Sequence, residues 1–269
     1  MKKIAYLFLS LFLALSVAVS NVTAQDIQPS GKSLGLDGQG NAIYQVHANG
    51  IDIGYKLIGS GKPLVMIMGL GGKMNWWPQE LIEMLSKKHQ LILLDNRGMG
   101  YSTANDATFS CKLFAGDVMG LLDSLGVQKA NVLGFSMGSM VAQELLLEYP
   151  ERFNKVIIYA TTTDGSNVAK ALRRKTSDDP TILRQIEAID RWKTPLNKLP
   201  LISNPVMLIV GTSDSMVGVE SSKTLASAIP GAWLVQFKNA SHSLMNEKPA
   251  RFATIVSTFL DIEETVDAK

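Results

Sequence analysis

A serine stands between two glycines in the sequence Gly-Phe-Ser-Met-Gly at residues 134–138. The apolar residues 130–133 before it are typical of a short buried strand, and residues 139–147 after it are typical of a helix. A serine in this pattern, between a strand and a helix, occupies a tight turn that projects its hydroxyl group. Glycines suit the flanking positions because a Cβ atom there would collide with the reversing backbone. We therefore predict that Ser136 is a nucleophile.

A serine hydroxyl is a weak nucleophile until a base accepts its proton, and histidine is the usual base. The chain has three histidines. His242 follows the apolar segment 232–237, in a loop of the kind in which open α/β sheets place their functional groups. His47 and His89 have the sequence surroundings of solvated residues. We predict that His242 is the base.

The histidine needs a carboxylate to hold its tautomer, and two aspartates compete for this role. Asp214 follows the apolar segment 206–210, and Asp164 follows the apolar segment 156–160. Asp164 precedes a glycine, so it is equally suited to a turn or a helix cap. We favour Asp214. The order along the chain is then serine, aspartate, histidine, which is the order found in folds that carry a serine on a strand-to-helix turn.

Two backbone N–H groups are candidates to stabilise an oxyanion. The first belongs to Met137, the residue after the serine, at the positive end of the helix dipole. The second belongs to Leu70, in the sequence Gly-Leu-Gly-Gly at residues 69–72, where glycines allow the backbone to approach a substrate closely. A flexible glycine turn without such a role is the alternative for this loop.

Apolar residues on the loops around these groups predict an acyl or alkyl pocket. For the two tryptophans, packing of one part of the chain on another is an equally good interpretation. The candidate lining residues are Leu70, Trp76, Trp77, Phe135, Met137, Met216, Val217, Leu244 and Met245.

Alternating strand and helix patterns must position these residues. Continuous apolar runs predict covered strands at 64–68, 91–94, 156–160 and 206–210, whereas the alternation at 51–57 predicts a half-exposed edge strand. Amphipathic helices are predicted at 79–87, 113–125 and 137–149, after a loose arm at 25–42. This order indicates an α/β fold with a doubly wound, mostly parallel twisted sheet and helices on both faces.

Residues 161–204 depart from this alternation and predict a short helical cap inserted between two strands of the sheet. Ile182, Ile186 and Ile189 share one face of a helix that begins after Asp179-Pro180. Asp179 and Asp190 are expected to be solvated there. An ordinary surface excursion is the alternative, but an insertion of this length is usually functional.

The N-terminus predicts export. Two lysines precede the apolar run 4–19, and the small-residue pattern at 22–24 suits cleavage after Ala24. The run is shorter than the ~20 residues of a spanning helix, which disfavours the alternative of a retained anchor. We expect a signal peptide at 1–24, a single domain at 25–269 and a periplasmic or secreted protein without stable membrane insertion.

Composition excludes several classes of partner. The chain carries 26 Lys and Arg residues and 24 Asp and Glu residues, so loss of Lys2 and Lys3 leaves 24 of each sign. A neutral mature protein is not expected to bind nucleic acid or an anionic membrane. The lone Cys111 cannot form an internal disulfide, and no cysteine and histidine spacing suits zinc, so we expect neither a metal nor another cofactor.

Residues 54–260 resemble the α/β-hydrolase superfamily. The resemblance rests on the serine turn, on Asp-Asn-Arg-Gly-Met-Gly-Tyr-Ser at 95–102, and on the helix–strand–turn–helix unit at 117–150. The 95–102 loop is expected to be structural. Many relatives carry His-Gly where this chain has Met68-Gly69. The histidine there is usually structural, so this departure concerns the geometry of the loop and leaves the expected catalysis intact.

The resemblance implies an α/β-hydrolase fold and a serine esterase that acts on small carboxylic esters or related acyl compounds, its small-molecule partners. Serine at position 136 argues against the aspartate-nucleophile branches, the haloalkane dehalogenases and epoxide hydrolases. Perhydrolase or haloperoxidase chemistry, lactone opening and peptide cleavage of the proline-iminopeptidase kind remain open. So does a poorly catalytic ligand-binding or receptor protein. For an aminopeptidase, the cap offers Asp178, Asp179 and Glu187 as amine ligands, which is a weak match.

Overall fold

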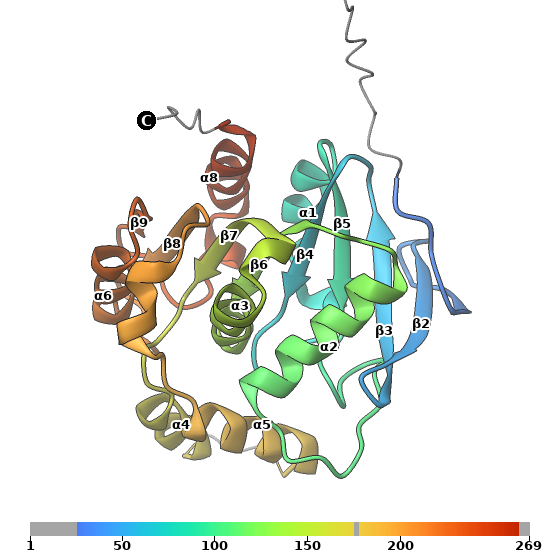
Figure 1. Cartoon of the computed structure of the whole chain (residues 1–269), viewed down its shortest axis with the longest axis horizontal. Coiled ribbons are helices and arrows are strands. Elements are labelled where there is room, and N and C mark those ends of the chain that lie inside the picture. The colour runs from blue at the N-terminus through green and yellow to red at the C-terminus, as the bar shows by residue number, and fades with distance from the viewer. Residues whose placement is uncertain (1–25, 175–177, 264–269) are drawn as a thin grey trace, which may run out of the picture.

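The computed structural model describes residues 26–174 and 178–263 (Figure 1). The predicted signal peptide and its cleavage site lie outside the described residues. The strands are β1 (Lys32–Leu36), β2 (Ala42–Ala48), β3 (Ile51–Ile58), β4 (Lys62–Ile67), β5 (His89–Leu94), β6 (Ala130–Phe135), β7 (Phe153–Tyr159), β8 (Val206–Gly211) and β9 (Trp233–Phe237). The α-helices are α1 (Gln79–Leu85), α2 (Cys111–Ser124), α3 (Met137–Glu148), α4 (Ser166–Arg173), α5 (Pro180–Arg191), α6 (Glu220–Ala228), α7 (Leu244–Glu247) and α8 (Pro249–Asp261).

The strands form one nine-stranded sheet in the order β1-β2-β3-β5-β4-β6-β7-β8-β9. The first three strands pair in an antiparallel manner, and β3 is antiparallel to β5. From β5 to β9 all pairs are parallel, so the loops after these strands meet at one edge of the sheet. The predicted α/β-hydrolase fold with a mostly parallel sheet is confirmed.

Helices cover both faces of the sheet (Figure 1). One buried cluster joins α2, α3 and α6 to the sheet through residues such as Phe114, Val141 and Leu225. The other joins α1 and α8 through residues such as Leu81 and Phe252. The parallel strands inside the sheet are therefore apolar on both sides, which explains the continuous apolar runs in the sequence.

Two expectations about the N-terminal region are wrong. The residues expected to form a loose arm contain β1, which is the outer strand. The segment expected at the sheet edge is β3, which pairs with β2 on one side and β5 on the other. Its alternating pattern does not indicate solvent, because Lys56 is only 2% exposed and forms an ion pair with Asp37, just beyond β1.

His89 is also placed wrongly by the sequence. It is the first residue of β5 and is 2% exposed, whereas we expected a solvated side chain after a longer helix. Neither ring nitrogen has a hydrogen-bond partner among the described residues. Burial lowers the pKa of His89 below its ordinary value, because the charged form is poorly solvated there.

Residues 161–204 contain α4 and α5, which lie together near the carboxyl ends of the parallel strands (Figure 1). We refer to α4 and α5 as the cap. Ile186 and Ile189 are buried on the inner face of α5, and Ile182 is half-buried. Trp192, directly after α5, donates from Nε1 to Glu144 Oε1 of α3 at 2.9 Å. The cap is thus attached to the helix that follows Ser136.

No helix of residues 26–174 and 178–263 is long and apolar enough to cross a membrane. The division of the chain into a signal peptide and a single domain with a cap insertion stays a prediction.

Candidate active site

Ser136 occupies a strained turn between β6 and α3. Its backbone has φ 54° and ψ −116°, a conformation that side-chain-bearing residues rarely adopt. A Cβ on Gly134 would lie 2.3 Å from the carbonyl oxygen of Gly138, and a Cβ on Gly138 would lie 2.1 Å from that of Ile67. Both positions therefore require glycine, for the steric reason that the sequence suggested.

The structure brings Ser136, His242 and Asp214 into one hydrogen-bonded chain. His242 Nε2 lies 3.0 Å from Ser136 Oγ, and His242 Nδ1 lies 2.8 Å from Asp214 Oδ2. A carboxylate at Nδ1 favours the tautomer that carries its hydrogen on Nδ1 and leaves Nε2 free to accept a proton. The arrangement has the geometry that a serine nucleophile and its base require.

Asp214 is held as a carboxylate. Its side chain is completely buried, which by itself raises the pKa. Its hydrogen bond with His242 and the N–H groups of Met216 and Val217, which donate to Oδ1 at 2.9 and 3.1 Å, outweigh burial. The pKa of Asp214 therefore lies below its ordinary value, and the group stays charged beside His242.

Asp164, the competing aspartate, lies elsewhere. Its carboxylate accepts from the N–H of Ser166 at 2.9 Å and forms an ion pair with Lys193 at 2.9 Å. Hydrogen bonds with Ser166 and Lys193 lower the pKa of Asp164 to about 2. It is thus a turn residue at the base of the cap, the alternative that its sequence allowed.

The loops that carry Asp214 and His242 are bound to each other. The N–H of Ser213 donates to the carbonyl oxygen of Ala240 at 2.9 Å, and a Cβ on Gly211 would lie 2.2 Å from that oxygen. Tyr159 Oη, at the end of β7, donates to the carbonyl oxygen of His242 at 2.7 Å. Sequence reasoning missed Tyr159, because a tyrosine within an apolar strand gives no positional signal.

The loop at residues 68–74 lies directly against the serine turn. A Cβ on Gly69 would lie 3.0 Å from Ser136 Cβ, so glycine allows the close approach. Leu70 N–H, the predicted donor, has no acceptor in the described part of the chain. Met137 is the first residue of α3, so its N–H has no acceptor within the helix. Neither N–H group therefore has an acceptor in the described part of the chain, as the predicted role at an oxyanion requires.

The 95–102 loop holds the loop at residues 68–74, which we call the oxyanion loop after its predicted role. The 95–102 loop was expected to be structural, and its contacts agree with this. Asn96 Nδ2 donates to the carbonyl oxygen of Met68 at 2.9 Å. Asp95 accepts from the N–H of Met74 at 2.7 Å through one oxygen and from Tyr101 at 2.8 Å through the other. Burial raises the pKa of Asp95 despite these hydrogen bonds.

A cavity of about 300 Å³ opens onto Ser136 and His242. Five predicted lining residues line it: Leu70, Trp76, Phe135, Met216 and Met245. The remaining four do not line it: Trp77, Met137, Val217 and Leu244.

The four residues outside the cavity pack within the fold. Trp77 and Leu244 belong to the buried cluster beside α1 and α8. Met137 belongs to the cluster beneath α3, and Val217 packs against both clusters. For Trp77, the packing interpretation is therefore correct. For the other three, proximity in sequence to the reacting groups was misleading, because neighbouring residues of a turn point in different directions.

Sequence reasoning missed the cap's contribution to the cavity. Val168 and Leu172 of α4 line it together with Ile189 of α5. Their spacing of four residues on one helix could have indicated this. Met140 of α3 and Met68 add further apolar surface. Among the described lining residues, His242 alone has an ionisable side chain, so the cavity carries no fixed charge.

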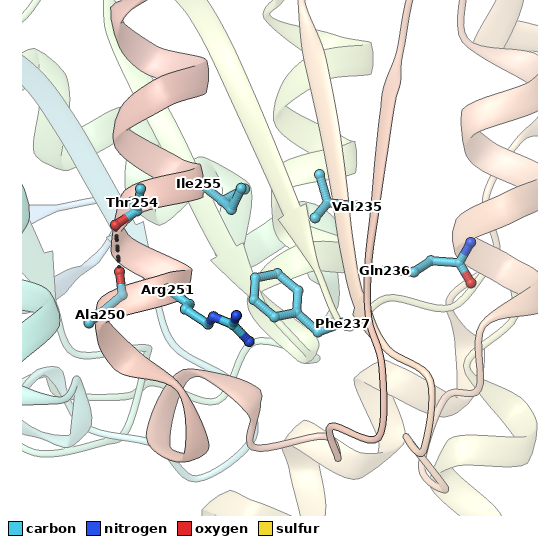
Figure 2. A pocket seen from close by; sticks show the side chains of 7 residues that line it. All are labelled: Val235, Gln236, Phe237, Ala250, Arg251, Thr254 and Ile255. Atoms are coloured by element: carbon cyan, nitrogen blue, oxygen red, sulfur yellow. Dashed lines mark hydrogen bonds between the residues drawn. The ribbon is translucent and has the colours of Figure 1, made fainter.

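A second apolar hollow, of about 390 Å³, lies between β9 and α8 (Figure 2). Val235 and Phe237 of β9 line it opposite Arg251 and Ile255 of α8, whereas the side chain of Gln236 points away from α8. It shares no lining residue with the Ser136 cavity. The described residues that line it include no serine, histidine or aspartate. Among the described residues there is no cluster of three or more potential metal ligands.

Comparison with known proteins agrees with this fold. A family described as the alpha/beta hydrolase fold matches residues 62–179, which include the oxyanion loop and Ser136. The solved enol-lactonase from Burkholderia xenovorans LB400 superposes with a TM-score of 0.73 over 81% of this chain and 100% of that one, at 24% identity. The chain has the α/β-hydrolase fold, and residues 62–179 match the family of that name.

Two relatives are similar to this chain along most of their length. A provisionally named non-heme bromoperoxidase of Mycobacterium tuberculosis is 27% identical over 256 residues, which cover 78% of this chain and 97% of the relative. A provisionally named carbamate hydrolase of Pseudomonas savastanoi pathovar phaseolicola is 26% identical over 245 residues, which cover 74% and 94%. The names differ in reaction, so the α/β-hydrolase fold of this chain does not by itself select a substrate.

Proposed function

We propose that this α/β-hydrolase cleaves small, uncharged carboxylic esters through an acyl-enzyme on Ser136. The observation that carries the proposal is the hydrogen-bonded chain from Asp214 through His242 to Ser136, which opens onto an apolar cavity. A pure binding protein would need neither the charged Asp214 nor the strained serine turn. The poorly catalytic alternative therefore has less support.

In the first half-reaction, Ser136 Oγ attacks the ester carbonyl carbon while His242 Nε2 accepts the hydroxyl proton. The carbonyl oxygen becomes an oxyanion, which the N–H groups of Leu70 and Met137 stabilise. The tetrahedral intermediate then expels the alcohol, and His242 returns the proton to the leaving oxygen. Water repeats the sequence on the acyl-enzyme with His242 as base again, which releases the acid and restores Ser136.

The substrate class follows from the cavity. Its wall is largely apolar and thioether-rich, which suits a flexible or irregular acyl group. A carboxylate or ammonium on the substrate would lose its hydration there without gaining an opposite charge. We therefore expect a preference for uncharged acyl groups.

Peptide cleavage from a free amino terminus has less support. Such a substrate presents an ammonium group, and the cap acids do not line the cavity. Glu187 is exposed, and its Oε2 lies 3.8 Å from Nη1 of Arg191. Asp179 caps the start of α5.

Perhydrolysis is a second candidate, favoured by the relative named as a bromoperoxidase. Hydrogen peroxide would replace water in the second half-reaction and release a peracid. The same acyl-enzyme serves both reactions, so the two differ only in the acceptor.

The test is hydrolysis of p-nitrophenyl esters of increasing acyl length, with lactones, amides and hydrogen peroxide as further arms. The Ser136→Ala variant should lose turnover of every active substrate while retaining its fold by circular dichroism. Ser227→Ala, at an exposed position on α6, is the matched control and should behave as the wild type. Full activity of Ser136→Ala would contradict the proposal.

We further propose that the protein is exported, because residues 1–24 carry the predicted signal peptide. Cell fractionation followed by N-terminal sequencing should find a mature chain that begins at Gln25 outside the cytoplasm. A full-length chain in the cytoplasmic fraction would contradict export.

A further inference from the structure

Gln185 is a polar residue on the inner, otherwise apolar face of α5. The side chain of Gln185 is 0% exposed. Its buried neighbours on the same helix include isoleucines, so an apolar side chain would be the ordinary choice at such a position. A buried amide is costly unless its oxygen and nitrogen find partners. The hydrogen-bond partners of Gln185 therefore indicate its role.

The side-chain amide of Gln185 joins two loops. Oε1 accepts from the N–H of Gly71 at 2.8 Å, and Nε2 lies 3.4 Å from the carbonyl oxygen of Arg97, to which it donates. Both partners are backbone groups on the loops at 68–74 and 95–102. The cap therefore contacts the oxyanion loop through a specific hydrogen bond as well as through packing.

Gly71 directly follows Leu70, the predicted oxyanion donor. One Cα atom separates the peptide plane that carries Leu70 N–H from the plane that carries Gly71 N–H, so the orientation of the second plane restricts the first. Gly71 has φ +64°, a conformation that glycine adopts readily but does not impose. A hydrogen bond at this residue is thus well placed to select one loop conformation.

Two side chains of the 95–102 loop hold the ends of the 68–74 loop: Asn96 binds the carbonyl oxygen of Met68, and Asp95 binds the N–H of Met74. Within the loop, Gly72 N–H donates to the carbonyl oxygen of Gly69 at 3.1 Å and closes a turn around Leu70 and Gly71. A Cβ on Gly71 would lie 3.3 Å from Cδ1 of Ile182, so α5 lies directly against the middle of the loop. Gln185 is the polar contact from the cap at that point.

We infer that Gln185 is a positioning residue: from the cap, it fixes Gly71 and so aligns Leu70 N–H with the oxyanion formed on Ser136. This rests on the proposed esterase function. Its consequence is that the cap, besides walling the cavity, completes the oxyanion site. A cap that lifts from the body would leave the hydrogen-bonded chain of Ser136 intact while misaligning one oxyanion donor.

The test compares steady-state kinetics of the wild type and Gln185→Met with the best p-nitrophenyl ester. Methionine has a similar length and volume but no acceptor for Gly71 N–H. We expect kcat to fall by about 10- to 100-fold, because loss or misplacement of an oxyanion donor acts in the transition state. KM should change by less than about 3-fold, since the cavity wall is preserved.

A second readout separates positioning from simple destabilisation. A trifluoromethyl ketone that forms a hemiketal oxyanion with Ser136 should lose affinity in Gln185→Met by the same factor as kcat/KM. The corresponding alcohol, which has no carbonyl group and forms no covalent bond with Ser136, should bind both proteins equally. If Gln185 were merely structural, Gln185→Met would lower thermal stability without this parallel loss of inhibitor affinity.

Two further variants complete the test. Trp192→Phe removes a partly buried hydrogen bond between the residue that follows α5 and Glu144 of α3 without touching the oxyanion loop, so it should lower thermal stability while keeping kcat within about 3-fold of the wild type. In Gln185→Glu, the buried carboxyl group is expected to stay protonated, to accept from Gly71 and to donate to Arg97, and so to recover most of the rate.

The outcomes are distinguishable. An active wild type with kcat unchanged in Gln185→Met would overturn the positioning role, as would equal kcat losses in Gln185→Met and Trp192→Phe. A wild type without esterase activity, equal to Ser136→Ala, would instead overturn the proposed function itself.

Discussion

Two histidines at opposite ends of the parallel strands differ in what surrounds them. His242 follows β9 at the carboxyl end, with Ser136 at one ring nitrogen and Asp214 at the other. His89 begins β5 at the amino end and is more deeply buried, yet neither ring nitrogen has a partner among the described residues. Burial of an ionisable ring therefore does not mark a site. What distinguishes His242 is a carboxylate at one ring nitrogen and a hydroxyl group at the other.

Replacing each of the two histidines with leucine should change kcat/KM by amounts that differ by orders of magnitude. We expect His242→Leu to lower kcat/KM for p-nitrophenyl esters by at least about 10⁴-fold, because the serine loses its base. His89→Leu should stay within about 2-fold of the wild type. The measurement is steady-state hydrolysis by both purified variants, and similar losses in the two would remove the distinction.

The carboxylate partner of His242 gives the next largest effect. Asp214→Asn should lower kcat by about 10³- to 10⁴-fold, since an amide no longer selects the tautomer with Nε2 free. Asp164→Asn, which alters the aspartate of the turn that contacts Lys193, should cost less than about 3-fold. Equal losses would place Asp164 in the machinery and contradict the geometry at His242.

The two apolar cavities offer the same contrast on a smaller scale. Leu172→Trp fills the Ser136 cavity and should raise KM about 10-fold or more for long acyl chains but not for acetate esters. Thr254→Trp places the same bulk in the hollow between β9 and α8 and should leave both constants unchanged (Figure 2). A KM effect from Thr254→Trp would mean that the hollow communicates with the reaction.

The smallest effect concerns acid stability. Burial lowers the pKa of His89 below its ordinary value of 6.5, so below that pH the unfolded chain takes up a proton that the folded chain resists. Stability is therefore fully present above this value and is lost as the pH falls. The lowered pKa of Asp214 acts below its ordinary value of 3.8, outside this window.

His89→Leu should remove this contribution. The Tm of the wild type should fall between about pH 7 and pH 5, and that of His89→Leu should fall by several degrees less. Thermal unfolding followed by circular dichroism measures both. An identical fall in the two proteins would show that His89 already finds a proton acceptor in the folded state.

Sequence reasoning succeeded where one short segment carries its own physical reason. The turn at Ser136 is such a case, because Gly134 is required by the carbonyl oxygen of Gly138 within the same segment. Only the second glycine, Gly138, also has a distant reason, the carbonyl oxygen of Ile67 on β4. Sequence reasoning failed where the reason lies in a distant segment. The sequence predicts a solvated position for Lys56 and for His89, but both are buried in the folded chain. Lys56 is covered by its ion pair with Asp37, which lies 19 positions before it.

The site shows the same division. Loops after strand ends predicted the residues that meet at Ser136, but the cavity wall from Val168, Leu172 and Ile189 depends on how the cap folds back. Gln185 was invisible for this reason, since its partner Gly71 is 114 positions away. Periodicity reveals which face of a helix is apolar, not which loop that face meets.

Covalent capture of the serine tests the central claim most directly. A fluorophosphonate probe should add one equivalent to the purified protein, with peptide mass spectrometry placing the adduct on Ser136, and Ser136→Ala should remain unlabelled at the same probe concentration. Labelling at another residue, or none in a folded protein, would contradict the account of Ser136 as an activated nucleophile.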